Sequence, residues 1–198
     1  MSSLLIRNAT LPDGRSGLDV LCVDGRIANL APRIPASAER TIDAGGMLVA
    51  PPFVDAHFPM DSTLTYGMPR VNASGTLLEG IALWGELKPT LTQDAIVGRA
   101  LAYCDWAVGK GLLAIRSHVD TSDPRLLAVE ALLHVRERVK PYLDLQLVAF
   151  PQDGLLRSPG ALHNLKRALS MGVDVVGGIP HFERTMADGA ESVRILCE

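Results

Sequence analysis

From residue 53 onward the chain alternates strand-like apolar runs with amphipathic helical patterns, and this alternation constrains its fold more than any other feature. The strand-like runs cover residues 47–53, 112–116, 144–150 and 173–177. Such nearly continuous apolar runs are typical of strands that are covered on both faces. Successive strand–helix units join into a parallel sheet with right-handed crossovers. The sequence therefore predicts an α/β fold with four such units, which is half the number in a (β/α)₈ barrel.

The helical segments between these runs carry recognisable start signals. Thr92 precedes a long amphipathic stripe that ends at Gly111. Asp123-Pro124 and Ser158-Pro159 each supply an N-cap residue followed by a proline at the first helical position. A further apolar, helix-like stretch covers residues 186–198. We expect a helix after each signal and over this last stretch.

Residues 1–52 have a different pattern of short strands and turns. Asp24-Gly25 lies between two apolar runs and is a strong signal for a two-residue β-hairpin turn. The segment is too small to hold a large core by itself. We therefore divide the chain into an N-terminal β-sandwich segment, residues 1–52, and an incomplete barrel, residues 53–198.

The composition excludes several classes of protein. A net charge of −3 without clustered Lys and Arg argues against a nucleic-acid partner. No run approaches the ~18 apolar residues of a membrane span, so we expect no membrane partner. The three cysteines lie far apart, which fits a reducing compartment better than a disulfide scaffold. We predict a cytoplasmic protein.

A partial metal-binding motif follows the first strand-like run. In a parallel barrel the carboxyl ends of the strands hold the active site, and His57 falls at such an end. Alternate residues of a strand point to the same side, so a second histidine at position 59 would complete a two-imidazole pair. Position 59 is Pro59, which has no donor atom in its side chain. We therefore expect metal binding by this chain alone to be weak or absent.

Six strings, in this order and at these spacings, resemble the amidohydrolase superfamily and within it the cytosine deaminase branch. They are GGMLVAPP (45–52), VDAH (54–57), NASGTLLEG (72–80), RSHVD (116–120), VAFPQDG (148–154) and GIPHFE (178–183). The resemblance implies the first half of a (β/α)₈ TIM-type barrel, preceded by a small β-sandwich segment. The whole enzyme would hold one divalent metal, iron or zinc, whose bound water attacks the carbon that carries the exocyclic amine of an aminopyrimidine-like substrate.

The resemblance also assigns individual residues. His57 matches the metal ligand of the first strand. Gln152 matches the amide that pairs with the polar edge of the ring, and Phe150 and Leu77 match residues that line its pocket. His181 follows the fourth strand and is a candidate for the same pocket. The other histidine ligands, the catalytic glutamate and the metal-binding aspartate would come from later strands, so we expect no catalytic residue within this chain.

Two alternatives remain beside cytosine-like deamination in pyrimidine metabolism. The first keeps the superfamily and changes the substrate to isocytosine, an aminotriazine or another cyclic amidine or amide. The second is a non-catalytic, truncated remnant, and Pro59 favours it. The habit of the family adds a homo-oligomer to the expected partners.

Overall fold

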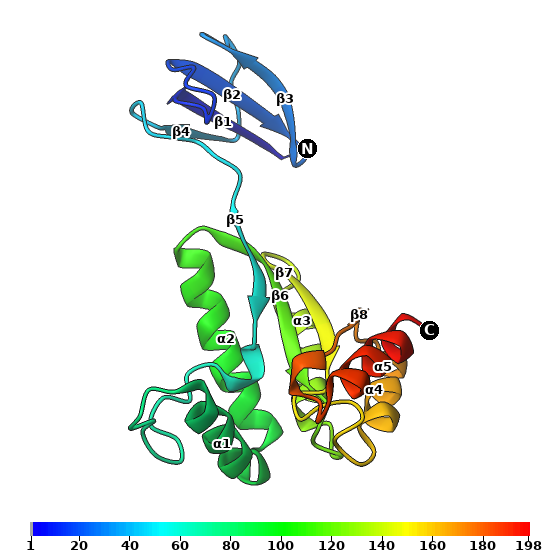
Figure 1. Cartoon of the computed structure of the whole chain (residues 1–198). Coiled ribbons are helices and arrows are strands. Elements are labelled where there is room, and N and C mark those ends of the chain that lie inside the picture. Colours follow the sequence, from blue (N-terminus) through cyan, green and yellow to red (C-terminus); the bar gives the residue numbers. More distant parts are fainter. Residues whose placement is uncertain (1) are drawn as a thin grey trace. The chain divides into compact units, whose positions relative to one another are not determined.

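The computed structural model describes residues 2–198, which form two compact units joined between Pro51 and Pro52 (Figure 1). The first unit is one four-stranded sheet in the order β3-β2-β1-β4. Its strands are β1 (Ser3–Ala9), β2 (Leu18–Val23), β3 (Arg26–Ala31) and β4 (Arg40–Asp43). β2 pairs antiparallel with β1 and β3, whereas β4 lies parallel to β1.

The predicted hairpin is confirmed in this sheet. Asp24 and Gly25 join β2 to β3 with φ angles of 49° and 76°. Two successive positive φ angles are the requirement of a tight turn whose twist matches that of the flanking strands. The core of this unit is small and centres on Ala9, Val20 and Ala44.

The second unit contains a parallel sheet whose strand order, β5-β6-β7-β8, follows the sequence. Its strands are β5 (Phe53–Phe58), β6 (Leu112–Asp120), β7 (Asp144–Phe150) and β8 (Val175–Val176). The α/β class and the parallel sheet expected from the sequence are thus confirmed. β5 and β8 are the outer strands of the described sheet.

Within residues 2–198, five helices and three short 3₁₀ turns lie between or after the strands of the second unit. They are η1 (Met60–Ser62), α1 (Leu77–Leu87), η2 (Lys88–Thr90), α2 (Gln93–Gly109), α3 (Leu127–Val139), α4 (Ala161–Ser170), η3 (Pro180–Phe182) and α5 (Met186–Cys197). As expected, Thr92 caps α2, and its hydroxyl accepts a hydrogen bond from Ala95 N at 3.3 Å. Figure 1 shows α1 near the end of the sheet toward which the strand arrows point.

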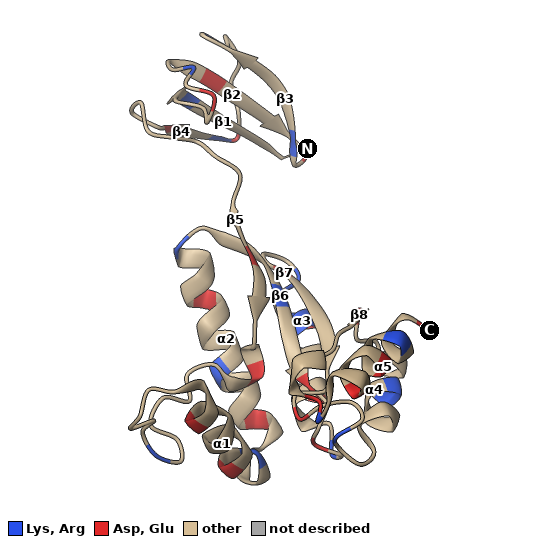
Figure 2. Ribbon diagram, viewed as in Figure 1, with Lys and Arg blue, Asp and Glu red and all other residues tan. Residues whose placement is uncertain are grey.

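The main core lies between the sheet and its helices. Ile96 of α2, Val129 and Leu132 of α3, and Leu147 of β7 are all buried in it. Each has about 1.5–3 kcal/mol of favourable burial relative to exposure, so this layer dominates the stability of the second unit. Figure 2 shows acidic and basic residues interspersed over the elements. No helix among residues 2–198 has the length and apolarity needed to cross a membrane.

The expected first strand is wrong in position. Residues 47–52 do not form a sheet strand, and Met47 and Leu48 are largely exposed. Leu48 makes only an isolated bridge to Thr10, because this segment leads from one compact unit to the other. The strand that ends beside His57 begins at Phe53 instead.

Two helices begin later than their cap signals predict. Leu126 and Gly160 adopt left-handed backbone conformations, with φ of 54° and 78°, and the helices start directly after them. The Asp123 carboxylate accepts from Arg125 N at 3.0 Å and from the Arg125 side chain at 2.7 Å, but the N-cap of the helix is Leu126. The fourth strand is shorter than expected and covers two residues.

Candidate functional site

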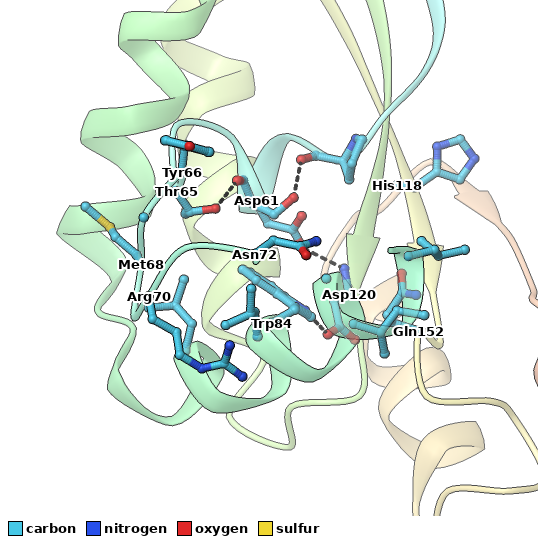
Figure 3. Close-up of a pocket in the computed structure, with 18 residues that line it drawn as sticks. Asp61, Thr65, Tyr66, Met68, Arg70, Asn72, Trp84, His118, Asp120 and Gln152 are labelled. Atoms are coloured by element: carbon cyan, nitrogen blue, oxygen red, sulfur yellow. Dashed lines mark hydrogen bonds between the residues drawn. The ribbon is translucent and has the colours of Figure 1, made fainter. Parts of the chain in front are cut away.

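A cavity of about 310 Å³ lies at the carboxyl ends of the parallel strands (Figure 3). Its wall is built from η1, the loop that precedes α1, α1 itself, and the ends of β6 and β7. Apolar lining comes mainly from the loop and α1. The polar or charged side chains in the wall include Asp61, Arg70, Asn72, His118, Asp120 and Gln152. The site thus combines an apolar wall with a few convergent polar groups, as small-molecule sites commonly do.

The start of α1 is fixed by a capping arrangement. Thr76 is the N-cap and its hydroxyl accepts from Glu79 N at 3.3 Å. The Glu79 carboxylate accepts from Ser74 N at 2.6 Å and from Arg70 at 2.9 Å. Bonds from the Ser74 side chain and backbone, followed by Arg70, lower the pKa of Glu79 to about 2. Glu79 is therefore an ionised structural anchor that holds the pocket wall, and it has no proton-transfer role.

Three donors converge on the buried carboxylate of Asp120 at the end of β6. Lys88 Nζ and Trp84 Nε1 both lie 2.8 Å from its Oδ2 atom, and Ser122 N donates to its Oδ1 atom at 2.7 Å. Lys88 also contacts Asp153 at 2.9 Å. Burial alone would lower the pKa of Lys88, but Asp120 and then Asp153 outweigh it, so the pKa is raised. The ammonium stays charged between two carboxylates.

A second buried carboxyl group lies beside this network. Asp61 is 2% exposed, and its Oδ2 atom accepts a hydrogen bond from Asp120 N at 2.9 Å. Burial, and next the negative charge of Asp120, raise the pKa of Asp61 to about 7. Figure 3 shows these contacts beside the cavity. A carboxyl group in a cavity wall with its pKa raised to this range can change its protonation state near neutral pH.

Two imidazoles meet at the end of β5. The His57 and His118 ring centroids are 3.9 Å apart, and Phe150 packs edge-on against His118 at 5.4 Å. Burial, then the charge of His57, lower the pKa of His118. His118 Nδ1 is buried without a hydrogen-bond partner in the described structure. A neutral imidazole with a free nitrogen has the chemistry of a metal ligand.

The described residues do not complete a metal site. A catalytic zinc centre has three protein ligands, and residues 2–198 contain no group of three His, Cys, Asp or Glu side chains placed to hold an ion. His57 and His118 supply two imidazoles, and Pro59, which lines the cavity, supplies none. The side chains present therefore do not by themselves fit the metal that the family generally uses.

The structure brings some of the expected site residues together. Gln152 and Leu77 line the cavity. Phe150 and His57 lie one contact away, on either side of His118. His181 is exposed in η3 and is not part of the cavity wall.

Sequence reasoning left Asp61, Asp120 and Lys88 without a role. Asp120 and Asp61 could have been found from their position, because each follows or ends a strand where the site of a parallel sheet lies. Lys88 carries no comparable signal. Its partners Asp120 and Asp153 are distant in the sequence and meet it only in the fold.

The comparisons with known proteins agree with this geometry. Residues 40–194 match the sequence profile of the amidohydrolase family. N-isopropylammelide isopropyl amidohydrolase of Pseudomonas sp. (strain ADP) is 35% identical over 181 residues, which are 89% of this chain and 45% of that protein. The chain thus spans about half the length of this relative.

Two solved structures are similar over nearly the whole chain. One is 5-methylcytosine deaminase from Klebsiella pneumoniae in complex with 5-fluorocytosine, at 40% identity and a TM-score of 0.90, covering 97% of this chain and 47% of that one. The other is N-isopropylammelide isopropylaminohydrolase from Burkholderia multivorans, at 32% identity and a TM-score of 0.82, covering 100% and 50%. The expected likeness to the N-terminal part of amidohydrolase barrels is confirmed. The chain belongs to the amidohydrolase family.

Proposed function

We propose that the protein carrying this chain hydrolytically deaminates a small cytosine-like aminopyrimidine. The observation that carries the proposal is the placement of Gln152 in the wall of a cavity at the strand ends, in a chain 40% identical to a 5-methylcytosine deaminase. The active sites of parallel barrels lie at this end of the strands. The ligand bound in that solved structure, 5-fluorocytosine, is a ring of the proposed class.

The described residues support recognition of such a ring. The Gln152 side chain offers a donor and an acceptor in one plane, which matches the adjacent donor and acceptor groups of a pyrimidine edge. Leu77 supplies apolar surface in the same wall, part of which is formed by α1 and its preceding loop. A metal in this family supplies an activated water. Because the described side chains do not complete its site, we assign no proton-transfer step to any of them.

A second candidate substrate is an aminotriazine. It is favoured by the two N-isopropylammelide hydrolases, which are 35% and 32% identical to this chain. The triazine ring presents a similar polar edge, so Gln152 could serve both rings. The two candidates differ in the leaving group, since one releases ammonia and an N-alkylated ring releases an alkylamine.

The test is a product assay on the full-length protein supplied with iron or zinc. Cytosine, 5-methylcytosine, isocytosine and N-isopropylammelide are incubated separately, and ammonia and isopropylamine are quantified. We expect ammonia from a cytosine. Release of isopropylamine alone would move the assignment to the triazine, and no amine from any ring would support a non-catalytic chain.

A further inference from the structure

Lys88 forms ion pairs that link the end of α1 to Asp120 and Asp153, which lie at and just after the ends of β6 and β7. It is the first residue of η2 and directly follows α1. Its ammonium lies 2.8 Å from Asp120, at the end of β6, and 2.9 Å from Asp153, in the loop after β7. Its side chain is 13% exposed and that of Asp120 is 5% exposed, so water screens the pair with Asp120 much less than a surface pair.

The contact between Lys88 and Asp153 affects the position of Gln152, because Gln152 and Asp153 are adjacent in the sequence. Gln152 N donates to Phe150 O at 2.9 Å, and Asp153 N donates to Ser122 Oγ at 3.0 Å. Lys88 adds the bond that holds the Asp153 side chain. The backbone from which the Gln152 amide reaches the cavity is therefore held on both sides.

The contact with Asp120 fixes a neighbouring part of the wall, because Asp120 ends β6, the strand that pairs with β7. Lys88 is the only cation bonded to this carboxylate within residues 2–198, and Trp84 Nε1 is a neutral donor to it. Asp120 is 5% exposed and lines the cavity. A buried carboxylate that loses its cation leaves an uncompensated charge, and this strongly destabilises its buried position. Removing the ammonium should therefore displace Asp120 as well as Asp153.

We propose that Lys88 is a positioning residue that sets where the Gln152 amide lies and thereby determines which ring edge the pocket accepts. Lys88 does not line the cavity, and it acts through Asp153 and Asp120. The part of the inference that concerns the ligand rests on the proposed function, whereas the part that concerns the position of Gln152 does not.

The test compares Lys88→Met, which keeps the apolar stem, with Lys88→Arg, which keeps the charge. Lys166→Met is the matched control, since Lys166 is exposed on α4. Two readouts are taken on the full-length protein. The first is the ¹⁵N–¹H NMR signal of the Gln152 side-chain amide without ligand, and the second is ¹⁹F NMR titration with 5-fluorocytosine, followed by KM and kcat on cytosine.

In Lys88→Met we expect the ligand-free Gln152 signal to shift and broaden. Kd for 5-fluorocytosine and KM should rise roughly tenfold, as expected for one lost hydrogen bond, with a smaller change in kcat. Lys88→Arg should recover most of the natural Gln152 signal and most of the ring affinity. Lys166→Met should match the natural protein in both readouts. If Lys88→Met does not fold, Asp153→Asn serves instead, because Asp153 is 44% exposed and tolerates the change.

An unchanged Gln152 signal in Lys88→Met, or in Asp153→Asn, would overturn the inference. A shifted signal with unchanged Kd and KM would overturn its link to specificity. If the natural protein binds no 5-fluorocytosine and deaminates no ring, the proposed function has failed, and the ligand-free Gln152 signal still decides whether Lys88 positions that residue.

Discussion

Replacing Asp61 with asparagine should change how the stability of the protein depends on pH. Burial, and then the charge of Asp120, raise the pKa of Asp61 from 3.8 to about 7. A carboxyl group whose pKa is raised by folding keeps its proton in the folded state, so its contribution to stability is complete below pH 4 and is lost as pH rises through 7. Between pH 5 and pH 8 this loss amounts to about 2–3 kcal/mol. Asparagine is uncharged throughout and still offers an oxygen to Asp120 N.

The assay is urea unfolding of the natural protein and Asp61→Asn at pH 5, 6.5 and 8. Contributions from titrating groups distant from Asp61 cancel in the difference between the two proteins. Between pH 5 and pH 8 we expect the free energy of unfolding to fall by about 2–3 kcal/mol more in the natural protein than in the variant. Asp94→Asn, which removes an exposed carboxylate from α2, controls for the loss of one charge. Parallel stability profiles for the natural protein and Asp61→Asn would refute the reasoning, because they would mean that folding leaves the acidity of Asp61 unchanged.

Three further predictions concern the pocket and the sheet. Pro59→His should raise bound zinc, measured by elemental analysis, and turnover with it, because it adds an imidazole to the cavity wall; unchanged metal content would show that position 59 faces no metal. Gln152→Ala should weaken ring binding by about 1–3 kcal/mol in calorimetry, while exposed Gln93→Ala should not, and equal affinities would remove Gln152 from the pocket. The 198-residue chain expressed alone should self-associate in sedimentation, because its outer strands expose Phe53, Val54 and Val176; a monodisperse monomer would contradict this.

The elements predicted best from sequence are those set by local chemistry. The Asp24-Gly25 turn and the Thr92 cap each depend on a few adjacent residues, and both lie where expected. The cap signals at Asp123 and Ser158 mislead, because the left-handed residues Leu126 and Gly160 delay the helix in each case. Leu126 is fully buried, so tertiary packing overrides the local signal there.

The candidate site was predictable only in part for a related reason. Gln152 and Leu77 could be placed by resemblance, and both line the cavity. The pairing of Lys88 with Asp120 and Asp153 joins residues 32 and 65 positions apart, and the approach of His118 to His57 depends on the pairing of neighbouring strands. Such contacts follow from the register and packing of the whole sheet, which no short motif encodes.

Hydrolytic deamination is tested most directly by following the oxygen and nitrogen atoms of the reaction. The full-length, metal-supplied protein is incubated in H₂¹⁸O with cytosine whose exocyclic amine carries ¹⁵N, and the products are analysed by mass spectrometry. Hydrolysis at the amine-bearing carbon predicts one ¹⁸O in the ring product and one ¹⁵N in the released ammonia. A ring product that retains ¹⁵N, or an opened ring, would contradict the account.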